Sequence, residues 1–137
     1  MGRILAIDYG SKRTGIAVTD PEKMIATALT TVQTSGLMEF LKKYCSENYV
    51  EQIIIGEPKR MDGTETHSSD AVKILFRKIK ENISVPVVMY DERFTSKIAM
   101  QSLISSGVKK SERRNKELVD RISATLILQS YLESINK

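Results

Sequence analysis

The 137-residue sequence predicts an α/β domain, with a mixed five-stranded sheet and helices on both faces. Three strand-like runs near the N-terminus lie close enough along the chain to form an antiparallel meander. Two later apolar runs are separated by helical segments, so we expect them to add to the sheet as parallel strands. The five runs are residues 4–7, 16–18, 25–32, 52–56 and 85–90.

Helices are predicted where apolar residues recur at spacings of three and four. They cover residues 38–49, 68–81 and 116–134, and a fourth covers 96–106 and stops at Gly107, a common residue after a helix end. Residues 109–116 carry five basic side chains and are expected to be exposed. With no internal repeat or linker, residues 1–137 are expected to form one domain.

Composition narrows the classes of protein to consider. No apolar run approaches the roughly 20 residues that span a bilayer. Arg3 and Asp8 bracket only four apolar residues, which argues against a signal peptide, so we expect a cytoplasmic protein without a membrane partner. The single cysteine, Cys45, excludes an internal disulfide and a multi-cysteine zinc site, and is expected to be a buried structural thiol. The net charge of +4 permits a nucleic-acid partner.

Three carboxylates occupy positions from which they could converge. Asp8 ends the first strand, Glu92 follows the last strand, and Asp120 lies in the final helix on the stripe continued by Ala124, Ile127 and Tyr131. If the first and last parallel strands are near neighbours, these acids meet around one point. Carboxylate oxygens without histidine or thiolate suit Mg²⁺ or Mn²⁺. Two such ions, roughly 4 Å apart, can activate a water and stabilise the leaving oxygen in phosphodiester cleavage.

Each acid also has an ordinary explanation. Asp8 could cap the turn that follows it, and Glu92 could pair with Arg93 or with a surface lysine. Asp120 could be an early-turn acid favoured by the helix dipole. These explanations account for each residue separately and give no reason for all three together, so spacing alone leaves both interpretations open.

Four motifs resemble one protein family from end to end. They are Ile-Asp-Tyr-Gly-Ser-Lys-Arg-Thr-Gly at 7–15, Gly-Glu-Pro at 56–58 with Met-Asp-Gly at 61–63, Asp-Glu-Arg-Phe-Thr-Ser at 91–96, and Val119-Asp120 leading into 124–132. In order and spacing they resemble the YqgF family of Holliday-junction-resolvase-like proteins, also called pre-16S ribosomal RNA nucleases. The resemblance implies a ribonuclease H-like fold, trimming of the 5′ end of the small-subunit ribosomal RNA precursor, and Asp8, Glu92 and Asp120 as metal-binding acids.

The sequence departs from the family pattern in two places. Glu57 stands where the family has an apolar residue, and it is either a fourth acidic ligand or a tolerated surface change, of which we favour the second. The lysine-rich approach to the last motif is looser here, as Lys116-Glu117-Leu118.

Basic residues recur beside the acids. Lys12 and Arg13 follow Asp8, Lys59 and Arg60 lie on the loop after the 52–56 strand, and Arg93 follows Glu92. Such side chains would hold phosphates without reading bases, and Gly10 and Gly63 would let the backbone approach a phosphate. The alternative is that they are solvated surface charges. His67 has no metal-ligand partner at useful spacing and is expected at the surface.

The leading hypothesis is a divalent-metal-dependent nuclease acting on structured RNA, most simply precursor ribosomal RNA, with ribosomal particles as an expected partner. Asp8 and Asp120 would hold the ions, and Glu92 would share them or orient the attacking water. One alternative is cleavage of branched DNA junctions by a symmetric dimer; a monomer or a homodimer fits the sequence. Others are a non-catalytic nucleic-acid-binding factor, and a nucleotide binder of the actin-like ATPase fold, which the short single-lobed chain disfavours.

Overall fold

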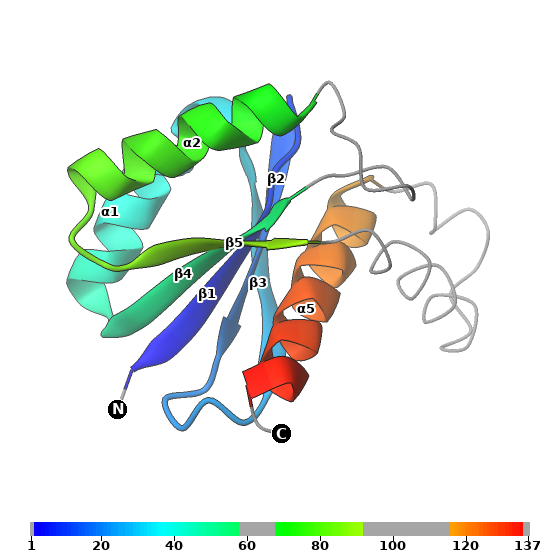
Figure 1. Ribbon diagram of the computed structural model, residues 1–137. Helices are drawn as coiled ribbons and strands as arrows, with labels where there is room; N and C mark the ends of the chain where they lie inside the picture. Colours follow the sequence, from blue (N-terminus) through cyan, green and yellow to red (C-terminus); the bar gives the residue numbers. More distant parts are fainter. Residues whose placement is uncertain (1, 58–67, 92–115, 136–137) are drawn as a thin grey trace.

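The computed structural model describes residues 2–57, 68–91 and 116–135, with side chains for 2–57, 70–91 and 122–135. Its five-stranded sheet has the order β3-β2-β1-β4-β5 (Figure 1). The elements are β1 (Arg3–Asp8), β2 (Arg13–Thr19), β3 (Ala26–Gln33), a short 3-10 turn (Thr34–Gly36), α1 (Leu37–Glu47), β4 (Val50–Glu57), α2 (Ser68–Asn82), β5 (Val87–Asp91) and α5 (Lys116–Ile135).

The predicted mixed sheet is confirmed. β1 pairs antiparallel with β2, and β2 with β3, whereas β4 is parallel to both β1 and β5. The expectation that β1 and β5 are near neighbours needs one correction, because β4 lies between them. Two strand spacings amount to about 10 Å, so acids that follow β1 and β5 must bridge that width to share a ligand.

Two apolar layers of different character flank the sheet. Large side chains fill the layer beneath α1 and α2, among them Leu5, Ile7, Ile16, Leu41, Ile53 and Ile55. On the opposite face, which α5 covers, the sheet contributes the small residues Ala6 and Ala17 beside Ile4 and Ile54, and the helix contributes Ala124 (Figure 1). Because small residues meet across this layer, α5 can pack close to the sheet.

Element boundaries differ from the sequence expectation where one residue changes the hydrogen bonding. The helix expected over 38–49 ends at Glu47, because Asn48 is extended and both its backbone N–H and its Nδ2 donate to the Tyr44 carbonyl oxygen. The last strand begins at Val87 because Pro86 has no N–H to donate to a strand neighbour, although its carbonyl accepts from Ile53.

The expected helix at 96–106 and residues 109–115 lie outside the described part of the chain. Within the described ranges, none of the helices combines the length and apolar character that crossing a membrane requires.

Candidate functional site

Asp8 lies at the end of a strand buried on both faces. Residues Ile4, Leu5, Ala6 and Ile7 before it are each at most 2% exposed, and Asp8 itself is half-buried. Side chains alternate along a strand, and Ile4 and Ala6 belong to the layer beneath α5. Asp8 therefore lies on the α5 face.

Glycines occupy the sheet positions on both sides of Asp8. Gly15 of β2 is its direct register partner, and Ile7 pairs with Ile55, so that Gly56 is the next residue on β4. Both glycines are buried. Since glycine has no side chain, neither of these two facing positions places one beside the Asp8 carboxylate.

The helix α5 runs antiparallel to β1. Its last residue, Ile135, lines a hollow together with Ile4, and the Tyr131 hydroxyl donates to Oε1 of Gln52, the register partner of Ile4 (2.9 Å). Tyr131 is therefore level with Ile4. Asp8 lies about 13 Å further along β1 than Ile4, at 3.3 Å per residue. Asp120 lies about 16 Å from Tyr131 in the same direction, toward the start of α5, at 1.5 Å per residue.

The first turns of α5 therefore lie toward the sheet edge at which Asp8 ends β1 (Figure 1). Asp120 comes one helical turn before Ala124, which is fully buried against the sheet. The side chain of Asp120 is not among those that the structure describes.

The remaining predicted site residues lie outside the described part of the chain. Glu92 is the residue after the end of β5, and the others are Lys59, Arg60, Gly63 and Arg93. His67, which is expected at the surface, also lies outside it. Among the side chains described, no three His, Cys, Asp or Glu residues gather closely enough to hold a metal ion. Asp8 is the one acid of the predicted trio whose side chain is described, so the trio stays a prediction.

Glu57 ends β4 on the other side of the sheet from Asp8. Ile53 and Ile55 belong to the layer beneath α1 and α2, and alternation places Glu57 on that face. Its register partner there is Asp91 of β5. This placement disfavours Glu57 as a fourth metal ligand and agrees with the favoured view of a tolerated change.

The turn between β1 and β2 is held by a threonine from the β3 end. The Thr34 hydroxyl donates to the Gly10 carbonyl oxygen (2.6 Å) and accepts from the Thr14 hydroxyl (2.9 Å), and the Thr34 N–H donates to the Lys12 carbonyl oxygen (3.0 Å). A Cβ atom on Gly10 would lie 2.2 Å from the Arg13 carbonyl oxygen. Gly10 therefore has a packing role that the sequence did not reveal, beside the predicted approach to phosphate.

Lys12 and Arg13 border a hollow of about 520 Å³ at the end of the β2–β3 pair. Lys12 is exposed and Arg13 is half-buried. The hollow is also lined by Ser11, Thr31, Val32, Gln33 and Ser35. Two cationic groups with hydroxyl and amide groups between them suit phosphate oxygens. Sequence reasoning missed Gln33 and Ser35, because only the pairing of β2 with β3 brings them beside Lys12.

The cysteine offers no activated nucleophile. Cys45 packs half-buried against the core layer beneath α1 and α2. Burial raises the pKa of its thiol above the ordinary value, which keeps the thiol protonated and unreactive. The position agrees with the structural role expected from the sequence.

Comparison with known proteins identifies the family of this chain. The family model RuvX, described as Holliday junction resolvase, matches residues 2–134. The chain belongs to the RuvX family. A protein of Christiangramia forsetii is 54% identical over 136 residues, covering 96% of this chain and 98% of that protein. One of Phocaeicola vulgatus is 51% identical over 135 residues, covering 98% and 97%.

Both of these relatives bear the name "Putative pre-16S rRNA nuclease". These matches confirm the resemblance to the YqgF family that the four motifs indicated. Membership places the RuvX-family chain among nucleases, hydrolases that act on phosphodiester bonds.

Solved structures confirm the ribonuclease H-like resolvase fold. Fowlpox virus resolvase in complex with Holliday junction DNA superposes with a TM-score of 0.62 at 13% identity, covering 98% of this chain and 99% of that chain. The RuvC protein of T. thermophilus in complex with a Holliday junction substrate gives 0.56 at 18%, covering 98% and 96%. At these identities the likeness concerns the fold.

Proposed function

We propose that this RuvX-family chain acts as a single nuclease domain that hydrolyses the precursor of 16S ribosomal RNA at its 5′ end, in the cytoplasm. The observation that carries the proposal is the position of Asp8. It is a carboxylate at the end of a buried strand, flanked by Gly15 and Gly56 and on the face that α5 covers. The substrate follows from the names of relatives that are about half identical over nearly the whole chain.

In this proposal Asp8, Glu92 and Asp120 hold Mg²⁺ or Mn²⁺, with Glu92 sharing the ions or orienting the attacking water. Asp8 has the oxygen chemistry that these ions prefer. The antiparallel course of α5 supports bringing Asp120 to the level of Asp8, and Glu92 directly follows β5, whose Val88 and Tyr90 pack in the layer beneath α5. Bound there, the ions would lower the pKa of the attacking water and stabilise the leaving oxygen.

Basic side chains would hold the RNA backbone around the carboxylates. Lys12 and Arg13 line a hollow at the β1–β2 turn, and the turn is fixed by Thr34. We assign Lys59, Arg60 and Arg93 the same task from their places in the sequence, and Gly10 the close approach of backbone to phosphate. Contacts of this kind position the substrate and set its register without reading its bases.

The acids are tested by cleavage of precursor 16S RNA with Mn²⁺ or Mg²⁺, with and without chelator. Asp8→Asn keeps the shape of the side chain and removes its charge, and is expected to lower the rate by about 100-fold or more, since both ions depend on it. Asp70→Asn, the same change at an exposed acid of α2, is the matched control and should cleave at the wild-type rate. Cleavage that survives both the chelator and Asp8→Asn would exclude the proposed chemistry.

A second candidate function is cleavage of branched DNA, because the family model carries that description and resolvases share the fold. A four-way DNA junction placed in the same assay separates the two. Junction cleavage with intact RNA would favour the resolvase, which also predicts a symmetric dimer. RNA binding without cleavage, unchanged in Asp8→Asn, would favour a non-catalytic factor.

A further inference from the structure

We propose that the end of the molecule opposite Asp8 is a docking surface for a basic protein segment with an apolar anchor, carried by a protein bound to the precursor RNA. The surface comprises the loop from Asp20 to Ile25, the start of β4 and the last turn of α5. The identity of the RNA-bearing particle rests on the proposed function. The chemistry of the segment rests on the surface itself.

Apolar side chains project from this end of the molecule. Met24 is 73% exposed, Ile25 65% and Ile135 50%. Met24 borders two hollows, one of about 650 Å³ with Pro86 and Ile135 and one of about 610 Å³ with Ile25 and Leu132. Exposed methionine and isoleucine beside hollows can receive an apolar side chain, which is how the anchors of protein interfaces bind.

The loop that carries Met24 and Ile25 is fixed in shape. The Asp20 carboxylate accepts the N–H groups of Met24 and Ile25, each at 2.8 Å, and the bonds from Ile25 and Met24 hold the pKa of Asp20 below its ordinary value. Lys23 is in the left-handed region at φ 61°, and its N–H donates to the Asp20 carbonyl oxygen (3.0 Å). A loop held in this way loses little conformational freedom when a partner binds.

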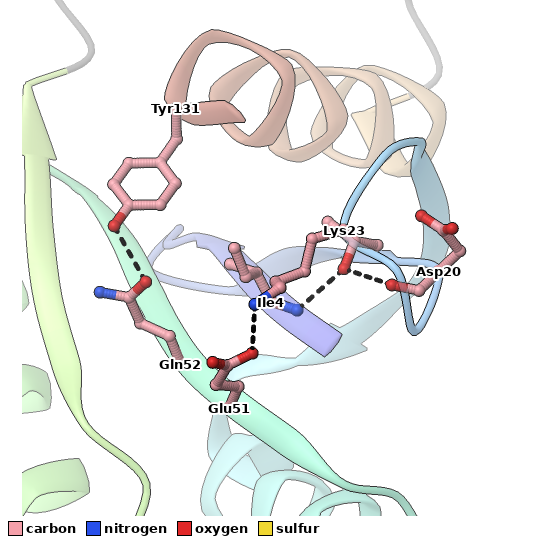
Figure 2. A network of polar contacts seen from close by, with 7 residues as sticks. Ile4, Asp20, Lys23, Glu51, Gln52 and Tyr131 are labelled. Carbon is pink, nitrogen blue, oxygen red and sulfur yellow. Dashed lines mark hydrogen bonds and ion pairs between the residues drawn. The ribbon is translucent and has the colours of Figure 1, made fainter. Parts of the chain in front are cut away.

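Side-chain contacts tie this loop to the sheet, and the sheet to α5. Figure 2 shows Lys23 reaching from the loop to Glu51 of β4 (2.7 Å) and Tyr131 reaching from α5 to Gln52 (2.9 Å). The Ile4 N–H donates to the Thr19 hydroxyl (2.9 Å), which in turn donates to the Asp20 carbonyl oxygen (2.9 Å). The exposed apolar groups therefore stand on a rigid base.

The charges around the apolar groups are mainly acidic, although the whole chain has a net charge of +4. The carboxylates are those of Asp20, Glu22, Glu51 and Glu133. Among the side chains that the structure describes there, the cations are Lys23, which pairs with Glu51, and Arg3, which donates to the Thr19 carbonyl oxygen (3.0 Å). Such a surface repels phosphate groups and anionic lipid and attracts lysine and arginine, so it favours a basic protein segment.

This surface and Asp8 lie at opposite ends of the parallel strands. Ile4 and Gln52, at the start of β1 and β4, line the hollow beside Met24, whereas Asp8 ends β1. The RNA and a protein bound to it could therefore contact the chain at the same time, and each contact would raise the effective concentration of the other. We expect tighter binding to the precursor particle than to the same RNA without protein.

The test compares binding to precursor small-subunit particles with binding to deproteinised RNA from the same particles. Met24→Ala and Ile25→Ala should each weaken particle binding by about tenfold or more and leave binding to bare RNA within about twofold of wild type. Ile74→Ala is the matched control, because Ile74 is 54% exposed on α2, and it should change neither. Equal losses on both ligands, a loss in the control, or no loss on particles would each overturn the docking surface.

A second measurement does not depend on RNA binding. The full chain, with a photoreactive amino acid at position 24, is mixed with the proteins extracted from the particles after the RNA has been removed. It is expected to crosslink to a segment rich in lysine or arginine. The same amino acid at position 74 is not expected to do so. Equal yields at the two positions, or crosslinks to acidic segments, would overturn the proposal. If cleavage fails while this crosslink forms, the proposed function is wrong and the docking surface remains.

Discussion

Gly10 and Gly36 differ in what surrounds the place that a Cβ atom would occupy. At Gly10 that atom would lie 2.2 Å from the Arg13 carbonyl oxygen, which is backbone and cannot rotate away. At Gly36, just before α1, nothing lies within 4 Å. The first glycine is therefore fixed by the close approach of two backbone segments beside the candidate site, and the second is not.

The substitution Gly10→Ala is expected to lower the free energy of unfolding by about 1–3 kcal/mol, because the turn must open to admit the methyl group. Gly36→Ala should stay within about 0.5 kcal/mol of wild type, since a weaker helix cap and a less flexible unfolded chain offset each other. Urea unfolding followed by circular dichroism measures both. Equal stability of the two variants would show that the turn adapts and that Gly10 has no packing role.

At the scale of elements, the close packing of α5 connects fold to site. Ala124 is fully buried and packs in the layer that Ala6 and Ala17 line. A larger side chain there would push the helix away from the sheet. Asp120 lies one turn further toward the helix N-terminus, so the same displacement would change its distance from Asp8.

Ala124→Leu is expected to cost about 1–3 kcal/mol of stability. The variant protein that remains folded should also cleave more slowly in the presence of metal, because the helix that carries Asp120 moves. Gln129→Leu, at an exposed position of the same helix, is the control for hydrophobicity and should change neither quantity. The readouts are urea unfolding and cleavage of precursor RNA under conditions in which both variants are folded. Reduced stability with full activity would separate α5 packing from the active site and weaken the role proposed for Asp120.

The sequence predicted the strands and helices of the described part of the chain because each carries its own local pattern of apolar residues. The run from Ile4 to Ile7 is apolar without alternation, and the structure buries it on both faces. The order of the strands in the sheet could not be predicted from such local patterns, since no feature of the β4 sequence indicates that it pairs with both β1 and β5. The end of α1 at Glu47 likewise depends on how the Asn48 side chain bonds to Tyr44.

The same distinction holds at the candidate site. The position of Asp8 follows from its place at the end of a buried strand, and Lys12 and Arg13 follow it on a turn. The bracing of that turn by Thr34, and the presence of Gln33 and Ser35 beside Lys12, arise from the pairing of β2 with β3. Contacts between residues some twenty positions apart leave no periodic signal in the sequence.

In the described part of the chain, the hollows at the two ends of the strands differ in the charge of the side chains that line them. Lys12 and Arg13 line the hollow at the end where Asp8 finishes β1, whereas Glu22, Glu51 and Glu133 line the hollows at the other end, together with Lys23. Nucleic acid should bind at the first end, and its affinity should fall as the salt concentration rises, because each phosphate contact releases counterions. A protein bound at the second end should not change that dependence.

The salt dependence of binding to bare RNA tests this polarity. Lys12→Ala should weaken binding and reduce the slope of log K against log salt concentration by about 0.7 to 1, the value for one lost phosphate contact. Met24→Glu, at the opposite end, and Lys78→Ala, at an exposed position on α2, should leave the slope unchanged. Fluorescence anisotropy from 50 to 300 mM salt, roughly the range over which such contacts weaken, resolves the difference. An unchanged slope in Lys12→Ala would remove Lys12 from the RNA interface, whereas a reduced slope in Met24→Glu would bring RNA to the acidic end and contradict the two-ended arrangement.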